Sequence, residues 1–186
     1  MTQKNIDNKK KSNTIHQITI VAMLCAVSVV LSALESMVEI LPFMIPGMKL
    51  GLSNVAVMFA LEVCSLPSAF CVVLFKALFA LVTRGGTAFL MSFFGGFCAT
   101  LAMYLLLSSK RVRFGYIGVG ITGAVLHNTG QLMVAFLLVG EAVAAYALFL
   151  IFMSLITGSL TGLLNFLTLP YVRKIPTAGK NISDDM

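Results

Sequence analysis

The residues best able to do chemistry in this sequence are charged side chains inside long apolar runs. Lys76 lies near the centre of one such run, and Glu35 and Glu39 lie one helical turn apart near the end of another. A charge in hydrocarbon costs at least about 2.5 kcal/mol, so such groups are paired, hydrated, or part of a ligand or ion route. A lysine donates hydrogen bonds and carries positive charge, which suits anionic groups. Two roles stay open for Lys76: a structural pair with Glu35 or Glu39, and contact with a ligand.

A second group of polar side chains lies within the fragment HNTGQL, residues 127–132. His127 and Gln131 are one turn apart and share a helix face, and Asn128 is adjacent. These side chains either form interhelical hydrogen bonds or line a cavity. A proton relay through His127 lacks a chain of carboxylates at matching depth.

A third feature is the segment LPFMIPGMKLGLSN, residues 41–54, which separates two apolar runs. Its two prolines and two glycines rule out a continuous helix, so the chain bends here. Irregular backbone at membrane depth is tolerated only where protein or a water-filled cavity covers it. The segment is therefore expected to form one wall of a site in the outer half of the membrane. The candidate ligand-binding residues are Glu35, Glu39, Lys49, Asn54, Lys76, Arg84, His127, Asn128 and Gln131.

The composition sets the class of protein. The chain has 186 residues, 59% of them hydrophobic and 11% charged, with a mean hydropathy of +0.98, whereas an average soluble domain has about 25% charged residues. The apolar runs are about 17 to 28 residues long, which suits membrane helices and not β-barrel strands. We predict an all-α integral membrane domain over residues 15–170 between polar tails at 1–14 and 171–186. The first apolar run is expected to be retained, because a polar tail precedes it and no cleavage site follows.

The distribution of basic residues predicts the topology. Ten of the thirteen lysines and arginines lie in the tails and in the loop around residues 110–113, which the positive-inside rule places in the cytoplasm with both termini. This topology accounts for the net charge of +6, so the charge does not indicate binding to nucleic acid. Six helices are expected, over about 15–41, 50–63, 67–82, 88–107, 115–139 and 141–169. In the last of them, Gly158 and Gly162 have the GxxxG spacing of close helix packing, and the Gly95–Gly96 pair can pack closely, bend its helix or admit a ligand.

Several chemistries are not expected. The sequence has no P-loop, so it cannot drive transport with ATP on its own. Its only aspartates are Asp7, Asp184 and Asp185 in the polar tails, so no acidic cluster is available to hold magnesium against a diphosphate. The four cysteines form no metal-binding pattern, and no nucleophile–base pair stands out. We expect no metal, no cofactor and no catalysis by this chain alone.

At PGMKLGLSN (46–54) and HNTGQL (127–132) the sequence resembles the small membrane family labelled heptaprenyl diphosphate synthase component I, also called the Gx transporter family. The resemblance covers roughly residues 15–170. The six-helix plan is also similar to the substrate-binding S components of energy-coupling factor (ECF) transporters of the bacterial plasma membrane. In that comparison Ala22 and Ala26 would dock on the coupling subunit, and residues 46–54 would form the gate. The alternative for these two alanines is packing within the chain.

Two functional hypotheses follow. One is a substrate-binding membrane subunit for uptake of a vitamin or precursor, with a partly anionic or zwitterionic ligand and separate coupling and ATPase subunits. The other is a noncatalytic membrane subunit that associates with a polyprenyl diphosphate synthase for quinone side chains. A self-sufficient transporter, dimeric or not, is a further alternative.

Overall fold

The computed structural model describes residues 3–38, 51–109 and 114–172, and helix is the only regular secondary structure in these ranges. Most of the basic N-terminal tail is helical and forms the first turns of the first helix. The elements are α1 (Gln3–Val38), α2 (Asn54–Val63), α3 (Leu66–Arg84), α4 (Gly86–Leu107), α5 (Tyr116–Val139), a short 3-10 helix η1 (Gly140–Val143) and α6 (Ala144–Val172).

Five of these helices are long and apolar enough to cross a membrane: α1 from Thr14, α3, α4, α5 with η1, and α6. Their outward faces carry large apolar side chains, among them Phe75, Leu137 and Leu148. Apolar groups on the outside suit contact with lipid, and backbone polar groups are satisfied within each helix, as a bilayer requires. The predicted all-α membrane class is thus confirmed.

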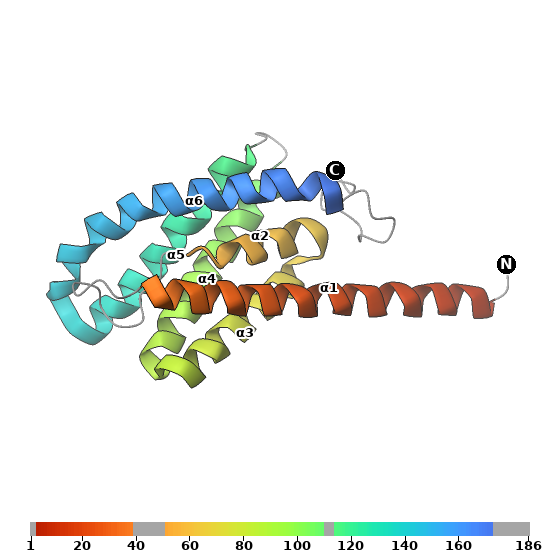
Figure 1. Ribbon diagram of the computed structural model, residues 1–186, viewed down its shortest axis with the longest axis horizontal. Helices are drawn as coiled ribbons and strands as arrows, with labels where there is room; N and C mark the ends of the chain where they lie inside the picture. The colour runs from red at the N-terminus through yellow and green to blue at the C-terminus, as the bar shows by residue number, and fades with distance from the viewer. Residues whose placement is uncertain (1–2, 39–50, 110–113, 173–186) are drawn as a thin grey trace.

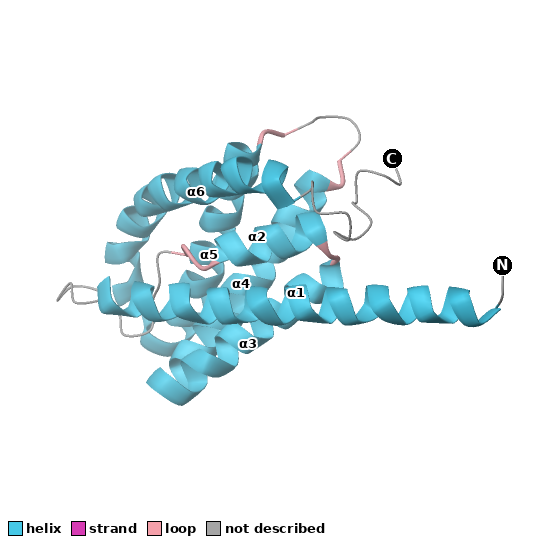
Figure 2. Cartoon of the chain, turned by 45° about the vertical axis from the view of Figure 1, so that its right-hand side comes forward, coloured by secondary structure: helices cyan, strands magenta, loops and turns pink. Residues whose placement is uncertain are grey.

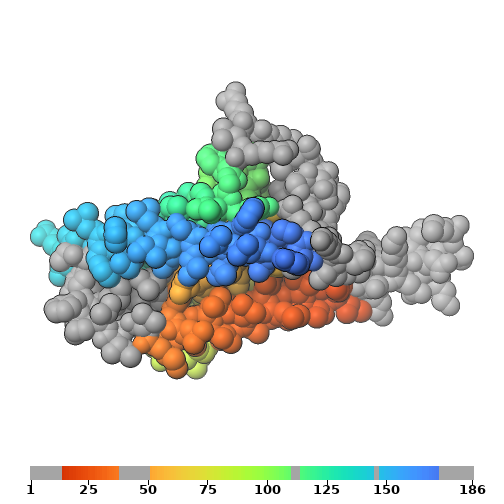
Figure 3. All heavy atoms as spheres, turned by 45° about the horizontal axis from the view of Figure 1, so that its top comes forward, coloured from red at the N-terminus to blue at the C-terminus, as the bar shows by residue number. Residues whose placement is uncertain are grey.

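The short helix α2 lies at the centre of the bundle. It packs against α1, α3, α4, α5 and α6, and Figure 2 shows it among the longer helices. In Figure 3 its orange-yellow atoms are visible between the blue α6 and the red α1. Ten residues of helix reach only about 15 Å, half of the roughly 30 Å hydrocarbon layer. The second predicted helix is therefore present but does not cross the layer by itself.

The helices alternate in direction. In Figure 1, α1 runs from right to left, α2 returns from left to right, α3 runs left again, and α6 runs from left to right. The end of α1 and the α3–α4 and α5–α6 connections lie on the left. The end of α1 is thus placed at the same end of the bundle as the short α3–α4 connection.

The start of α2 differs from the prediction because a tight turn precedes it. Gly51 has φ +93°, a conformation that glycine adopts at little cost. The N–H of Asn54 donates to the Gly51 carbonyl (3.0 Å), and the N–H of Val55 to that of Leu52 (3.0 Å). The helix therefore begins at Asn54 and not near residue 50. The predicted bend itself lies mostly in residues 39–50, outside the described residues.

Glycines allow the closest helix contacts. A Cβ on Gly158 would lie 2.5 Å from Cα of Ile121, and one on Gly162 would lie 2.4 Å from Cα of Ile117. The GxxxG prediction is confirmed, since these backbones touch where α5 and α6 cross. In α4, Gly95 abuts α5 and Gly96 abuts Val73 of α3, so this pair serves close packing.

The last predicted helix begins and ends three residues later than expected, over Ala144–Val172. It was predicted to stop before Pro170, yet α6 continues through it to Val172. Proline breaks a helix by removing one N–H and crowding the preceding turn, and here only the final residues follow it. The rest of α6 is unaffected.

Candidate functional site

Glu35, Ser53 and Lys76 form one buried network between α1, the start of α2 and α3. The Ser53 hydroxyl donates to Oε2 of Glu35 (3.0 Å) and accepts from Nζ of Lys76 (3.1 Å). Oε1 of Glu35 accepts from the backbone N–H of Leu52. Glu35 is 3% exposed and Lys76 is 0% exposed. An acid and a base are thus held in the membrane layer, one hydroxyl apart.

The amine of Lys76 has a second partner, Oδ1 of Asn54, at 3.1 Å. A lysine ammonium has three donors, and two of them reach neutral oxygens among the described residues. Of the two roles left open for Lys76, the structural one has only an indirect counterpart among the described residues, a link to Glu35 through the Ser53 hydroxyl. Ligand contact by Lys76 stays a prediction.

His127 and Gln131 share a face of α5, as predicted, and Nε2 of Gln131 lies 3.0 Å from Nε2 of His127. With the amide nitrogen as donor, the imidazole Nε2 is the acceptor. Both side chains are buried. Gly95 allows α4 to lie close to this part of α5. A Cβ on Gly95 would lie 2.7 Å from the His127 carbonyl oxygen and 3.0 Å from Cγ of Gln131.

Gly51 connects the two groups. A Cβ at Gly51 would lie 3.1 Å from Nδ2 of Asn54 and 3.4 Å from Cδ2 of His127. The turn before α2 therefore touches the imidazole on one side while its next residues hold Glu35 and Lys76 on the other. Glu35, Asn54, Lys76, His127 and Gln131 are consequently assembled around one turn.

Asn128 does not join this assembly. Its Nδ2 donates to the Leu150 carbonyl (3.2 Å) and to Oγ of Ser154 (2.8 Å), both on α6. One residue along a helix is a rotation of roughly 100°, which turns Asn128 away from His127. The interhelical hydrogen-bonding alternative thus describes Asn128.

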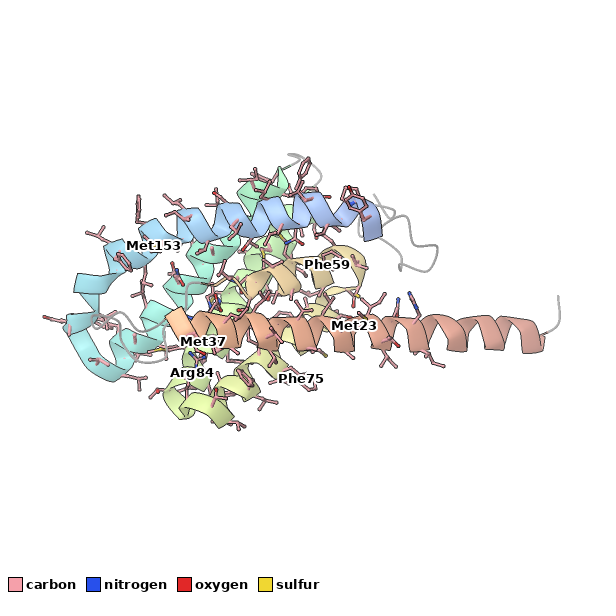
Figure 4. The ribbon with its side chains drawn as sticks, in the orientation of Figure 1. Met23, Met37, Phe59, Phe75, Arg84 and Met153 are labelled. Atoms are coloured by element: carbon pink, nitrogen blue, oxygen red, sulfur yellow. The ribbon has the colours of Figure 1, made fainter. Side chains whose placement is uncertain are left out.

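The other predicted residues are placed as follows. Arg84 is half-buried at the end of α3, and Figure 4 shows it at the same end of the bundle as Met37 of α1. Glu39 and Lys49 lie outside the described residues. Ala22 and Ala26 are exposed on α1 among the residues that the structure describes, and docking by these alanines stays a prediction.

Sequence reasoning missed two features. Ser53 escaped notice because a lone serine beside a glycine-rich turn is unremarkable. A buried polar row along α6 also escaped, although its three- and four-residue spacing was visible in the sequence. Nδ2 of Asn165 in this row donates to the Thr161 carbonyl (3.0 Å) and to the Val55 carbonyl of α2 (3.4 Å). The row consists of Ser154, Thr157, Thr161 and Asn165.

The assembly combines one buried ammonium, one buried carboxylate and several hydrogen-bonding side chains. Within the described ranges, no group of three His, Cys, Asp or Glu side chains is placed to hold a metal ion. Buried charges are stable only when they are paired and hydrogen-bonded. Glu35 and Lys76 are both hydrogen-bonded to the hydroxyl of Ser53, directly before α2. The chemistry that these residues offer is recognition of a charged group.

The comparisons with known proteins identify the family. The family model described as "Heptaprenyl diphosphate synthase component I" matches residues 24–167, which include every residue of the assembly. No curated protein and no solved structure matches the chain significantly. This chain belongs to the heptaprenyl diphosphate synthase component I family.

Proposed function

We propose that this chain is the substrate-binding membrane subunit of a small-molecule uptake transporter in the bacterial plasma membrane. The observation that carries the proposal is the burial of Lys76 and Glu35 within membrane-length helices. Ionisable groups at such depth are expensive, and their usual use is a ligand or ion route.

The position of the network supports a binding role. It is built on the start of α2, and α2 packs against all five long helices. A ligand that engaged Lys76 or Asn54 would therefore contact the one element that touches the whole bundle. Such an element can report ligand binding to a partner protein through its neighbours.

The proposed ligand is partly anionic or zwitterionic. Lys76 supplies positive charge, and Asn54, His127 and Gln131 supply hydrogen bonds. Arg84, Lys49 and Glu39 are proposed as further contacts toward the outer surface, with Asn128 acting indirectly through α6. Both termini are proposed to face the cytoplasm, where the lysine-rich start of α1 satisfies the positive-inside rule.

The energy source is proposed to be separate. Ala22 and Ala26 are exposed on α1, and small residues on a lipid-facing surface let another helix approach closely. This surface is the proposed contact with a membrane coupling subunit that joins the chain to ATPases.

Purification of the native complex tests the function. The tagged chain is extracted from its own membranes in mild detergent, and proteins and small molecules are identified together by mass spectrometry. We expect a coupling subunit, ATPases and a small anionic molecule. The variant Lys76→Met/His127→Leu should retain the protein partners and lose the small molecule. Unchanged small-molecule recovery would contradict the proposed binding residues, and recovery without ATPases would contradict the transporter assignment.

A second function is favoured by the description of the family. A component of heptaprenyl diphosphate synthase would act here as a noncatalytic membrane subunit, with the buried cation facing a diphosphate. In a deletion strain this role predicts loss of quinone side-chain synthesis that no externally supplied vitamin restores. Co-purification with a prenyl synthase in place of ATPases would select this function over uptake.

A further inference from the structure

The start of α2 has the features of an anion-binding site. A helix N-terminus carries partial positive charge and free N–H groups, which attract anions. Here the backbone N–H of Leu52, in the turn that leads into α2, donates to Oε1 of Glu35. The anion at this position thus comes from a different helix, α1.

Two more donors complete the surroundings of this carboxylate. The hydroxyl of Ser53, the N-cap residue of α2, makes no capping bond to its own helix and donates to Oε2 of Glu35 (3.0 Å). Behind it, Nζ of Lys76 lies 3.1 Å from the same hydroxyl. A backbone N–H and a hydroxyl therefore donate to one carboxylate, and a fully buried ammonium donates to the same hydroxyl.

The site also has a donor to spare. Nδ2 of Asn54 is buried and has no hydrogen-bond partner among the described residues, although Oδ1 of the same amide accepts from Lys76. A buried donor without an acceptor costs about 1–3 kcal/mol. This nitrogen lies close to the Gly51 turn, since a Cβ on Gly51 would be only 3.1 Å from it. The start of α2 therefore offers more donors than Glu35 uses.

We propose that Glu35 occupies an anion-binding site at the start of α2 as an internal ligand, and that a carboxylate of the transported molecule takes its place. The incoming carboxylate accepts from the Leu52 N–H and the Ser53 hydroxyl, as Glu35 does, and the Lys76 ammonium behind this hydroxyl balances its charge. Glu35 leaves the site in the exchange. The inference rests on the proposed function for the identity of the ligand, but its test requires neither transport nor the natural substrate.

Acetate is the matching probe. The part of a glutamate side chain beyond Cβ is chemically an acetate group, so Glu35→Ala leaves a space of that size. The full chain carrying Glu35→Ala is purified in detergent, and its thermal unfolding is followed by size-exclusion chromatography after heating. We expect sodium acetate to raise the unfolding midpoint by several degrees above that in equal sodium chloride. Formate should act more weakly, and propionate should have no effect because it is too large.

Matched variants show whether the site is responsible. The wild-type midpoint should be the same in acetate and chloride, since Glu35 fills the site. Glu35→Ala/Lys76→Met should also be indifferent to acetate, since the ammonium is gone. An acetate effect on Glu35→Ala no larger than that of chloride would overturn the proposal. Equal stabilisation of the double variant would do the same.

If the alanine variants fail to fold, a second pair of variants, Glu35→Gln with and without Lys76→Met, tests the site. Glu35→Gln keeps an acceptor for the Leu52 N–H, so we expect this variant to fold with a lowered midpoint, and Lys76→Met should recover most of that loss. A loss that is the same with and without Lys76 would show that the site does not bind charge, and would overturn the proposal. Acetate rescue combined with the absence of ATPases from the native complex would retain the anion site while rejecting the transporter role.

Discussion

The amine of Lys76 donates to Oδ1 of Asn54 over 3.1 Å, and this bond joins the middle of α3 to the first residue of α2. Because α2 packs against every long helix, a charge on α3 is coupled to the element at the centre of the bundle. Ser53 extends the connection to Glu35 on α1. Three segments distant in sequence therefore depend on one another's charge.

The first prediction concerns the loss of the buried cation. Lys76→Met leaves Glu35 buried without a compensating charge, so the free energy of unfolding should fall by about 3–5 kcal/mol. Denaturant unfolding of the full chain in micelles measures the change. Lys10→Met, which lies before the membrane span of α1, is the control and should be nearly neutral. A loss no larger than that of the control would show that Glu35 does not need Lys76.

The second prediction moves the negative charge. Asn54→Asp places a carboxylate directly beside Nζ of Lys76 in a side chain of the same shape. In a Glu35→Gln background, Asn54→Asp should therefore restore stability, whereas in the wild-type background it should destabilise by adding a second buried anion. Thermal midpoints of the four chains form a double-mutant cycle. Simple additivity in that cycle would contradict the charge coupling.

How much of this assembly was visible in the sequence differs between its parts. Lys76 and the His127–Gln131 pair were identified because a polar group in an apolar run is conspicuous, and one-turn spacing fixes a shared face. Asn128 was grouped with them by proximity, yet it contacts α6, because the direction of a side chain depends on which helices surround it. Ser53 was missed because a serine in a turn is not conspicuous in the sequence. Its role is visible only from its contacts with Glu35 and Lys76 in the folded chain.

The fold shows the same division. Six helices and their order follow from apolar run length and basic loops, and the observed order agrees with that prediction. The central place of α2 does not follow, because run length gives no information about which helix the others surround. The start of α2 at Asn54 likewise depends on the positive φ of Gly51. The sequence contains many glycines and does not indicate which of them adopts this conformation.

The third prediction tests the close approach of α4 to α5. Gly95→Ala would put a methyl group 2.7 Å from the His127 carbonyl oxygen, so the helices must separate and stability should fall by about 1–3 kcal/mol. Gly118→Ala is the matched control, because a Cβ there meets nothing within 4 Å. That control should be neutral or stabilising, since alanine favours helix over glycine. Equal effects of the two substitutions would contradict the packing at Gly95.

The fourth prediction separates Asn128 from the network around Lys76. Asn128→Ala removes the hydrogen bonds to Leu150 and Ser154, and bonds of this kind between membrane helices are worth about 0.6 kcal/mol on average and up to about 1.7. We expect a stability loss in that range and no change in the acetate response of a Glu35→Ala chain. Thr129→Ala, at the exposed neighbouring position, serves as the control. Loss of the acetate response would place Asn128 in the anion site after all.

The last prediction concerns the exposed alanines of α1. Ala22→Leu/Ala26→Leu adds bulk at two exposed positions of α1, so the thermal midpoint should stay within a degree or so of wild type, as for most exposed substitutions. If a partner helix packs closely there, the added side chains hold it away and co-purification of the coupling subunit should be lost. Ala142→Leu, the same change at an exposed alanine of η1, should leave both properties unchanged. Retention of the partner by the double variant would remove α1 as the docking surface, while a lowered midpoint would show that these alanines serve the chain's own fold.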